Sequence, residues 1–487
     1  MDVTPLLRML AAAWLAALLG MGLTEAAQAE TPSAVEPTFR LIDPQLLGDD
    51  EHVAGDGVRR VIPGQSNVFV IDPHGRLFGM GLNRRGSLGL GESITASRHL
   101  VPILDKPVRQ VVSHGHSLIV TADGELWGMG TNIHGQLGLG DTTRRDQPER
   151  VLQADVIKAA AGQRFSLVLE AGGKLWVMGA NAAEMAGIGK PESRGGASQF
   201  VEGRDSNRPV PLAEGVSDVA AHEGTGYFLK RDGSLWAVGL NKAEKRATKV
   251  SDGPIRLAAG ASNALLFIKA DGSLWSIGSG WTNVLGTGDE QDRTEPFQIE
   301  TAGVVDVTVG GANALYLKQD GSVWGMGRNR RADLGLGHDR KVLRPQQLSI
   351  EGQPIDSGLD VWTASGHTLI LNDNGQLWGT GDNYHRQLQR DPRYFNAPNR
   401  SLRRKYGLND WPAVSVRLFA DRQVGQAIGN AACTLIVDGN GELWTVGWHP
   451  TVSMTGGVYE LPGDQRLESR EARRLELPAA SPQPPVD

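Results

Sequence analysis

The chain has few of the residues on which several common protein classes depend. Its 487 residues include a single cysteine, Cys433, which excludes an intrachain disulfide and a cysteine-based zinc cluster. Its 49 Lys and Arg residues are outnumbered by 55 Asp and Glu residues, and the formal net charge is −6. Proteins that bind nucleic acid through bulk charge are normally basic, so we expect no nucleic-acid partner. Charged residues make up 21% of the chain and hydrophobic residues 40%, a balance typical of a globular protein.

Long apolar runs are confined to the N-terminus. Arg8 precedes an apolar segment at residues 9–23, and Ala27-Gln28-Ala29 follows it. This three-part pattern predicts a secretory signal peptide over residues 1–29, with an uncleaved membrane anchor as the alternative. No later run reaches the ~18 apolar residues that cross a bilayer, so we expect no membrane span after cleavage and a periplasmic or secreted protein.

Glycine is abundant, with 63 residues, and much of it lies in one repeated motif. The motif is Gly-x-(Leu/Val)-(Trp/Phe)-x-x-Gly, and copies follow one another at intervals of 39 to 66 residues. Regular self-similarity at this spacing is the signature of a repeat protein. The eight copies begin at Gly75, Gly124, Gly173, Gly233, Gly272, Gly321, Gly375 and Gly441.

The sequence around each motif predicts four short strands. An apolar run such as residues 117–121 is followed by a turn such as Ala122-Asp123-Gly124 and then by the motif. Asp-Gly between two strands favours a hairpin with a type I′ turn, in which both central residues have positive φ. A valine-rich run such as residues 108–115 precedes this hairpin, and a Pro- or Val-containing stretch such as residues 147–152 follows it.

The adjacent Leu and Trp of each motif select the architecture. Neighbouring residues point to opposite faces of a strand, so both faces of each sheet are apolar and must be covered. Antiparallel sheets that are covered on both sides and repeated around an axis form a β-propeller. We therefore predict an all-β propeller, with a linear β-solenoid as the alternative.

The loop after the motif identifies a family. Residues 130–141 read GTNIHGQLGLGD, and related loops occupy residues 81–92 and 327–339. Residues 123–141 closely resemble the repeat of the regulator-of-chromosome-condensation (RCC1) family. Together with the predicted signal peptide, this resemblance implies an exported, bacterial-type member of the family. The resemblance spans about residues 55–480 and implies a propeller, usually of seven blades. Eight motifs predict eight blades instead, with seven blades and one displaced module as the alternative.

Some modules depart from the family pattern. Residues 239–250 lack the Leu-Gly pair, Gln389 stands where Gly is expected, and residues 447–454 replace the loop in the last module. The predicted organisation is a signal peptide at 1–29, a lead-in at 30–54, a propeller at 55–478 and a disordered Pro-rich tail at 479–487. Residues 473–478 are expected to complete the last blade.

The sequence contains no recognisable catalytic or cofactor motif, so we expect neither an enzyme nor a cofactor. His114-Gly115-His116 could bind a metal, but His116 occupies the same module position as His367 and Asn313, which favours a structural hydrogen bond. The acidic residues 288–295 could hold calcium, but they lack the ligand spacing of an EF-hand. We therefore expect no metal site, and we expect Cys433 to be a small core residue.

Two modules carry insertions, at residues 189–209 and 390–412. The second combines basic and aromatic residues, the types that are enriched in binding hot spots. The composition leaves two interpretations open, a solvated loop with a basic face and a partner-binding loop. The predicted contact residues are Arg393, Tyr394, Arg400, Arg403, Arg404, Tyr406 and Trp411.

Together these features predict an exported, monomeric, non-enzymatic scaffold that binds a protein partner. The resemblance implies other roles that family members have, namely nucleotide exchange on a small GTPase, binding to chromatin, and inhibition of a secreted enzyme. The signal peptide and the acidic charge disfavour the chromatin role. A propeller enzyme that acts on glycans through a pair of carboxylates is the alternative from a different class.

Overall fold

A computed structural model gives the structure of the chain. All strands lie in one compact unit, Phe39–Asp487. The structure describes residues 40–41, 58–64, 67–153, 155–186, 205–240, 246–261, 263–350, 353–363, 366–381, 387–388, 416–429, 433–447 and 473–477. Among these residues, no helix is long and apolar enough to span a membrane.

Eight antiparallel sheets, here called blades 1 to 8, contain nearly all the strands, and each has its four strands in chain order. Blade 1 is β2 (Arg60–Pro63), β3 (Asn67–Ile71), β4 (Leu77–Leu82) and β5 (Ala96–Leu104). Blade 2 is β6 (Val108–Ser113), β7 (His116–Thr121), β8 (Leu126–Gly130) and β9 (Arg145–Leu152). Blade 3 is β10 (Val156–Ala161), β11 (Phe165–Glu170), β12 (Leu175–Gly179) and β13 (Ser206–Ala213). Blade 4 is β14 (Val216–His222), β15 (Thr225–Lys230), β16 (Leu235–Val238) and β17 (Thr248–Ser251).

The second half of the chain repeats the arrangement. Blade 5 is β18 (Ile255–Ala261), β19 (Ala264–Lys269), β20 (Leu274–Gly278) and β21 (Arg293–Glu300). Blade 6 is β22 (Val304–Val309), β23 (Asn313–Lys318), β24 (Val323–Gly327) and β25 (Val342–Gln347). Blade 7 is β28 (Gly358–Thr363), β29 (His367–Asn372), β30 (Leu377–Gly381) and β31 (Val416–Leu418). Blade 8 is β32 (Val424–Gly429), β33 (Cys433–Asp438), β34 (Leu443–Gly447) and β35 (Arg473–Arg474).

Short elements lie outside this pattern. The chain also forms a small hairpin, two 3-10 turns and one helical turn: β26 (Ser349–Ile350) with β27 (Gln353–Pro354), η1 (Arg84–Gly86), η2 (Gly280–Thr282) and α2 (Ala182–Met185). The N-terminal strand β1 (Arg40–Leu41) pairs in parallel with β18 and becomes a fifth strand of blade 5. A segment from the predicted lead-in therefore joins the propeller at the inner edge of that blade.

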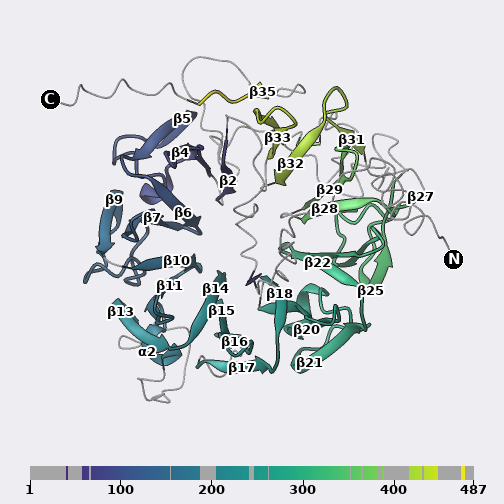
Figure 1. Cartoon of the computed structure of the whole chain (residues 1–487), viewed down its shortest axis with the longest axis horizontal. Helices are drawn as coiled ribbons and strands as arrows, with labels where there is room; N and C mark the ends of the chain where they lie inside the picture. Colours follow the sequence, from purple (N-terminus) through teal and green to yellow (C-terminus); the bar gives the residue numbers. More distant parts are fainter. Residues whose placement is uncertain are drawn as a thin grey trace, which may run out of the picture. The chain divides into compact units, whose positions relative to one another are not determined.

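The blades follow one another around a closed ring (Figure 1). The first strand of each blade contacts the first strand of the next, and β32 of blade 8 contacts β2 of blade 1. One apolar cluster spans this closure, including Val61 of blade 1 and Leu435 of blade 8. The eight-bladed prediction is confirmed and the seven-bladed alternative is wrong, because every motif lies in a complete sheet of its own.

The C-terminal segment completes blade 8, as the sequence predicts. Strand β35 pairs with β34, and the Leu475 N–H donates to the Leu443 carbonyl at 2.8 Å. Leu475 and Leu477 pack against the cluster that joins blades 8 and 1. All four strands of this closing blade therefore come from the C-terminal end of the chain.

The predicted hairpins are present, but the predicted turn type is wrong. In blade 2 the Gly124 N–H donates to the Thr121 carbonyl, and Thr121 and Glu125 bond across the turn. Gly124 has φ +85°, whereas Asp123 is not among the residues with positive φ. A three-residue loop with one left-handed glycine after a type I turn fits this pattern, whereas a two-residue type I′ turn does not.

A short hydrogen-bond chain explains the Asp-Gly-Ser-Leu-Trp sequences. In blade 4 the Ser234 hydroxyl donates to Asp232 at 2.5 Å and accepts from the Trp236 indole N–H at 2.9 Å. Blades 5 and 6 repeat these bonds. The turn thereby fixes the orientation of the indole on the third strand of the blade.

The Leu and the Trp of each motif lie on opposite faces, as predicted. Leu235 is fully buried, whereas Trp236 is partly buried and lies under the Lys230 ammonium, 4.5 Å from the ring centroid. Lys174 covers Trp176 in the same way at 3.9 Å. Aliphatic stems and cation–π contacts thus shield the indole faces that the neighbouring blade leaves uncovered.

Candidate functional site: the loop face

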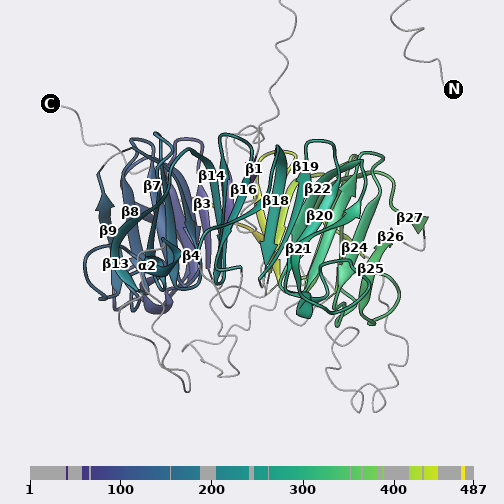
Figure 2. The same cartoon turned by 90° about the horizontal axis from the view of Figure 1, so that it is seen from below.

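The antiparallel blades divide the connections between two faces. The 1–2 and 3–4 loops, which join the first to the second and the third to the fourth strand, lie at one end of the strands, here called the loop face. The tight 2–3 turns and the links between blades lie at the other end, the turn face. Figure 2 shows the strands running between these two ends. In the described 3–4 connections of blades 1, 2, 5 and 6, the chain between the third and fourth strands lies on the loop face.

The family-like residues of the 3–4 loops hold the loops in shape. In blade 2, Asn132 accepts from the Leu137 N–H at 2.9 Å and donates to the carbonyls of Asp141 and Thr143. Leu137 is fully buried below the loop. Asn83 of blade 1 and Asn329 of blade 6 make the corresponding bonds. These amides are used within the protein, so their role is structural.

The residue that follows the loop Asn, or its counterpart in blade 5, is instead displayed to solvent. Ile133 of blade 2 is 64% exposed and Trp281 of blade 5 is 66% exposed. Arg84 of blade 1 and Arg330 of blade 6 occupy the same loop position and are also exposed. Ile94, from the 3–4 loop of blade 1, is 44% exposed. Three of the four large apolar side chains exposed in the described part of the chain therefore lie on the loop face.

Trp281 is held in place by its surroundings. Asp292 accepts hydrogen bonds from the Gly280 N–H at 2.9 Å and from the Ser279 hydroxyl at 3.1 Å, and so anchors the turn η2. The Arg328 guanidinium lies over the indole, 3.8 Å from the ring centroid. Trp and Arg are both among the residue types enriched in binding hot spots.

Sequence reasoning missed Trp281. The partial loop at residues 284–289 was recognisable, and its alignment on Leu285 places Trp281 at the position of Ile133 and Arg84. A large aromatic at an otherwise polar loop position was the available signal.

The buried histidines His114 and His222 are held neutral. The rings of His114 and His222 meet edge to face, with centroids 5.5 Å apart. They come from blades 2 and 4, and the intervening strand β10 ends in three alanines, at 159–161. Burial lowers the pKa of His114 to about 4, and burial together with the charge of His114 lowers the pKa of His222 to about 3. Buried histidines with such values stay uncharged at neutral pH.

His116 has the structural role that the sequence favoured. Its Nε2 lies 2.7 Å from the Ser166 hydroxyl of blade 3, and burial lowers its pKa to about 3. His367 makes the corresponding contact from blade 7 to Thr434 of blade 8, at 3.4 Å. These bonds join neighbouring blades. No group of three or more potential metal ligands occurs among the described residues.

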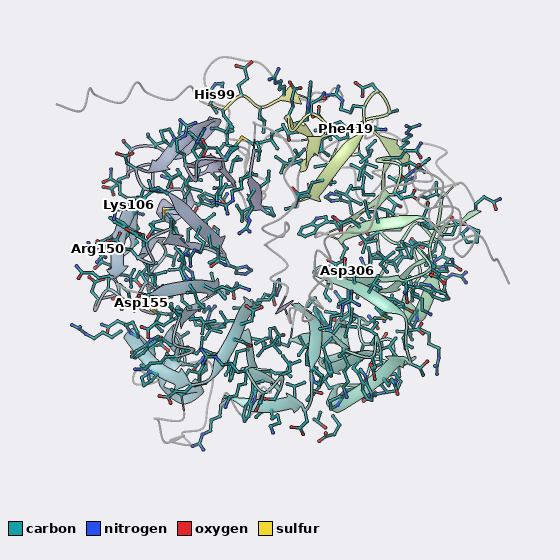
Figure 3. All side chains as sticks on the ribbon, viewed as in Figure 1. His99, Lys106, Arg150, Asp155, Asp306 and Phe419 are labelled. Carbon is teal, nitrogen blue, oxygen red and sulfur yellow. The ribbon has the colours of Figure 1, made fainter. Side chains whose placement is uncertain are left out.

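The first strands present charged groups on the inner side of the ring. In seven blades this strand has a register shift, and Lys158, Asp218, Asp306 and Asp360 follow the shift in blades 3, 4, 6 and 7. Lys158 and Asp218 pair at 2.5 Å. Figure 3 shows Asp306 on the inner side of the ring, whereas Arg150 lies on the outer side.

Blades 6 and 7 carry an acid at both of the corresponding positions, Asp306 and Asp360, so these two side chains cannot form an ion pair with each other. Burial raises the pKa of Asp306 to about 6. Burial, and secondarily the charge of Asp306, raises the pKa of Asp360 to about 7. Asp306 accepts a hydrogen bond from the Val307 N–H at 2.8 Å, so part of its role is to support the strand at the register shift.

The carboxylates of the acidic segment 288–295 have separate partners within the protein. Asp289 pairs with Arg293 at 2.7 Å, Glu290 pairs with Lys341, and Asp292 anchors η2. Cys433 is buried in β33, as predicted. The predicted partner-binding residues of the insertion at 390–412 lie outside the described residues.

Comparisons with known proteins agree with this architecture. The sequence model of the regulator of chromosome condensation (RCC1) repeat matches residues 123–169 and 271–317. No curated protein sequence matches the chain. The chain is an eight-bladed β-propeller, and two of its segments match the RCC1 repeat.

Solved structures support the same fold. Human WBSCR16 is 21% identical, with a TM-score of 0.50, over 67% of this chain and 89% of that one. Prp20p from Saccharomyces cerevisiae is 17% identical, with a TM-score of 0.51, over 73% of this chain and 86% of that one. At these identities the likeness concerns the fold alone.

Proposed function

We propose that the chain is an exported, non-enzymatic scaffold that binds a protein partner through its loop face. One observation carries the proposal: the exposed apolar side chains Ile94, Ile133 and Trp281, from blades 1, 2 and 5, all lie on the loop face. Trp and Arg are enriched in binding hot spots, and Trp281 lies exposed beside Arg328. The pattern of residues 1–29 supports export.

The described chemistry of the loop face suits binding better than catalysis. The side chains of Asn83, Asn132 and Asn329 are used in loop structure, and His116 and His222 are uncharged at neutral pH. The structural neighbour Prp20p binds Gsp1p and histones, so a protein with a similar fold has protein partners. The propeller supplies a rigid frame, and the variable loop position supplies the contacts.

The test is affinity capture from envelope and secreted extracts with the chain 30–487. A loop-face variant, Trp281→Ala with Ile133→Ser, is compared with a turn-face control, Asn374→Ala with Asn440→Ala, in which both side chains are exposed. A third variant replaces residues 390–412 by a Gly/Ser loop. We expect the loop-face variant to lose the captured protein and the turn-face control to keep it.

Capture that survives the loop-face changes but fails in the turn-face control would contradict the proposal. Loss in the Gly/Ser variant as well would add the predicted insertion to the binding surface.

A further inference from the structure

A cavity of about 240 Å³ lies on the loop face between blades 1 and 2. Its lining includes Asn67 at the start of β3, Ser87 in the 3–4 loop of blade 1, and Ser113 at the end of β6. Arg84 and Arg85 stand at its rim with exposed side chains. Sites for drug-sized ligands occupy ≈ 300–1,000 Å³, so this cavity suits one amino-acid-sized or sugar-sized group.

The floor of the cavity holds an unsatisfied acceptor. Asn67 is 3% exposed, and its Nδ2 donates to the Ser87 hydroxyl at 3.1 Å. Its Oδ1 is buried and has no hydrogen-bond partner among the residues that the structure describes. A buried amide oxygen without a donor is unfavourable by ≈ 1–3 kcal/mol, so most such atoms find a partner. An unpartnered oxygen beside a cavity points to a donor on a ligand.

The rim holds an unsatisfied donor. No acceptor for the Arg85 backbone N–H is found among the described residues. Arg85 also has φ +55°, a left-handed conformation that few residues other than Gly adopt. Arg85 therefore presents at the mouth of the cavity a guanidinium and an N–H that no described residue bonds.

Other blades fill the equivalent place with an oxygen from their own chain. In blade 6 the Arg331 N–H donates to Asp333 Oδ1 at 2.8 Å, and Asn313 Nδ2 donates to Asp333 Oδ2 at 2.6 Å. In blade 2 the His134 N–H donates to Gln136 Oε1 at 3.0 Å. Ser87 is the residue of blade 1 that corresponds to Asp333 and Gln136, and its side chain is too short to cap Arg85.

We propose that the cavity of blade 1 binds a carboxylate, in the role that Asp333 has in blade 6. The Arg85 N–H, the Ser87 hydroxyl and the two guanidinium groups donate to the carboxylate. A donor close to that carboxylate, such as a peptide N–H or a hydroxyl, satisfies Asn67 Oδ1. Charge-assisted bonds of this type are the strong ones, and Arg matches a carboxylate with two parallel bonds.

The carboxylate can come from a protein or from a free acid. On the proposed function, on which this assignment of the source rests, it is an Asp or Glu side chain of the protein partner. A free sugar acid offers the same carboxylate with hydroxyl donors. The experiment distinguishes the two sources.

Isothermal titration measures binding of three probes: N-acetyl-aspartate methylamide, D-glucuronate and inorganic phosphate. We expect the blocked aspartate to bind at one site per chain. Ser87→Asp supplies the carboxylate from the chain itself, as in blade 6, and should weaken binding at least tenfold without lowering the melting temperature. Arg85→Gly removes the guanidinium and relieves the left-handed strain, so it should also weaken binding in a folded protein.

The matched control is Arg331→Gly in blade 6, at the position of Arg85, where Asp333 already fills the loop; it should leave binding unchanged. Absence of binding to any carboxylate would overturn the proposal, as would unchanged binding in Ser87→Asp. Equal binding of phosphate would overturn the assignment to carboxylates.

The capture experiment separates this proposal from the proposed function. If Ser87→Asp loses both the blocked aspartate and the captured protein, the partner supplies the carboxylate. If it loses the probe but retains the captured protein, the cavity stands as a carboxylate site and its ligand is a free acid. If the loop-face variant of Trp281 and Ile133 retains the captured protein while the cavity still binds the probe, the proposed function fails and the cavity remains.

Discussion

The 3–4 loops of blades 1 and 6 have the same conformational anchor, but the loop of blade 1 lines a cavity, whereas that of blade 6 is filled by its own side chain. Both loops are held by an Asn that bonds the N–H of a buried Leu, at 2.9 Å from Asn83 and 3.0 Å from Asn329. In blade 6 the Asp333 carboxylate fills the loop, whereas Ser87 leaves a polar cavity in blade 1. One residue of the repeat thus decides whether a rigid loop is self-contained or can accept a ligand.

The largest effect is expected when blade 6 is converted to the state of blade 1. Asp333→Ser removes the acceptor of the Asn313 amide and of the Arg331 N–H, which leaves two polar groups unsatisfied. We expect the free energy of unfolding to fall by about 2–3 kcal/mol in urea titrations. Added N-acetyl-aspartate methylamide should raise the melting temperature of this variant more than that of the parent. An unchanged stability would show that Asp333 does not fill the loop in this way.

The glycine of the loop offers a second comparison. Gly86 has φ +78°, and a Cβ there would lie 2.4 Å from the Arg145 carbonyl oxygen of blade 2. Blade 6 has Ala332 at this position, with φ +56°. We expect Gly86→Ala to lower the free energy of unfolding by about 1–3 kcal/mol and Ala332→Gly to raise it by up to about 1 kcal/mol. Equal effects of the two variants would mean that the neighbouring blades do not distinguish the loops.

Blades 6 and 7 also differ from blades 3 and 4 at the inner strands, where Asp306 and Asp360 take the place of Lys158 and Asp218. Raised pKa values of about 6 and 7 mean that the folded state binds extra protons above the usual aspartate pKa. Stability should therefore fall as pH rises from about 4 to about 7. Asp360→Asn should raise the free energy of unfolding by about 1–2 kcal/mol at pH 8 and leave it unchanged at pH 4.

Thermal unfolding across this pH range checks the prediction, with Asp218→Asn as the control. Because Asp218 pairs with Lys158, its substitution should lower stability at pH 8. A gain in the control, or a gain from Asp360→Asn that does not depend on pH, would contradict the difference between the two pairs of blades.

The smallest expected effect is the difference in stability between glycine substitutions of Arg85 in blade 1 and of Arg331 at the same position in blade 6. Arg85 has φ +55°, whereas Arg331 is not among the residues with positive φ. Arg85→Gly should therefore raise the free energy of unfolding by about 0.5–1 kcal/mol, and Arg331→Gly should lower it by a similar amount. Denaturant midpoints compared at constant slope measure both changes. A loss of stability in Arg85→Gly would show that the arginine contributes more by its contacts than it loses by strain.

Much of the fold could be predicted from the sequence because the motif repeats. Eight copies of one pattern give the number of blades, and the adjacent Leu and Trp show that both sheet faces are covered. The turn type was not predictable from Asp-Gly alone, because the same dipeptide also occurs in a three-residue loop with one left-handed glycine. The pairing of β1 with β18 was not predictable either, because a two-residue strand carries no periodic signal.

The candidate site was less accessible to sequence reasoning. The composition of residues 390–412 predicts a binding loop, but these residues lie outside those that the structure describes. Trp281 could have been found by aligning the loops on their Leu-Gly pairs. The cavity could not, because it depends on Ser87 of one blade, Ser113 of the next and the unbonded Oδ1 of Asn67, and only the fold brings these together.

Hydroxyl-radical footprinting of the chain with its captured partner tests the central claim most directly, because the indoles report separately on different surfaces. Trp281 is exposed on the loop face. Trp176 in β12 and Trp275 in β20 are instead partly buried under Lys174 and Lys269. We predict that the partner strongly protects Trp281 from oxidation and leaves Trp176 and Trp275 unchanged. Protection of Trp176 and Trp275 with unchanged oxidation of Trp281 would contradict binding through the loop face.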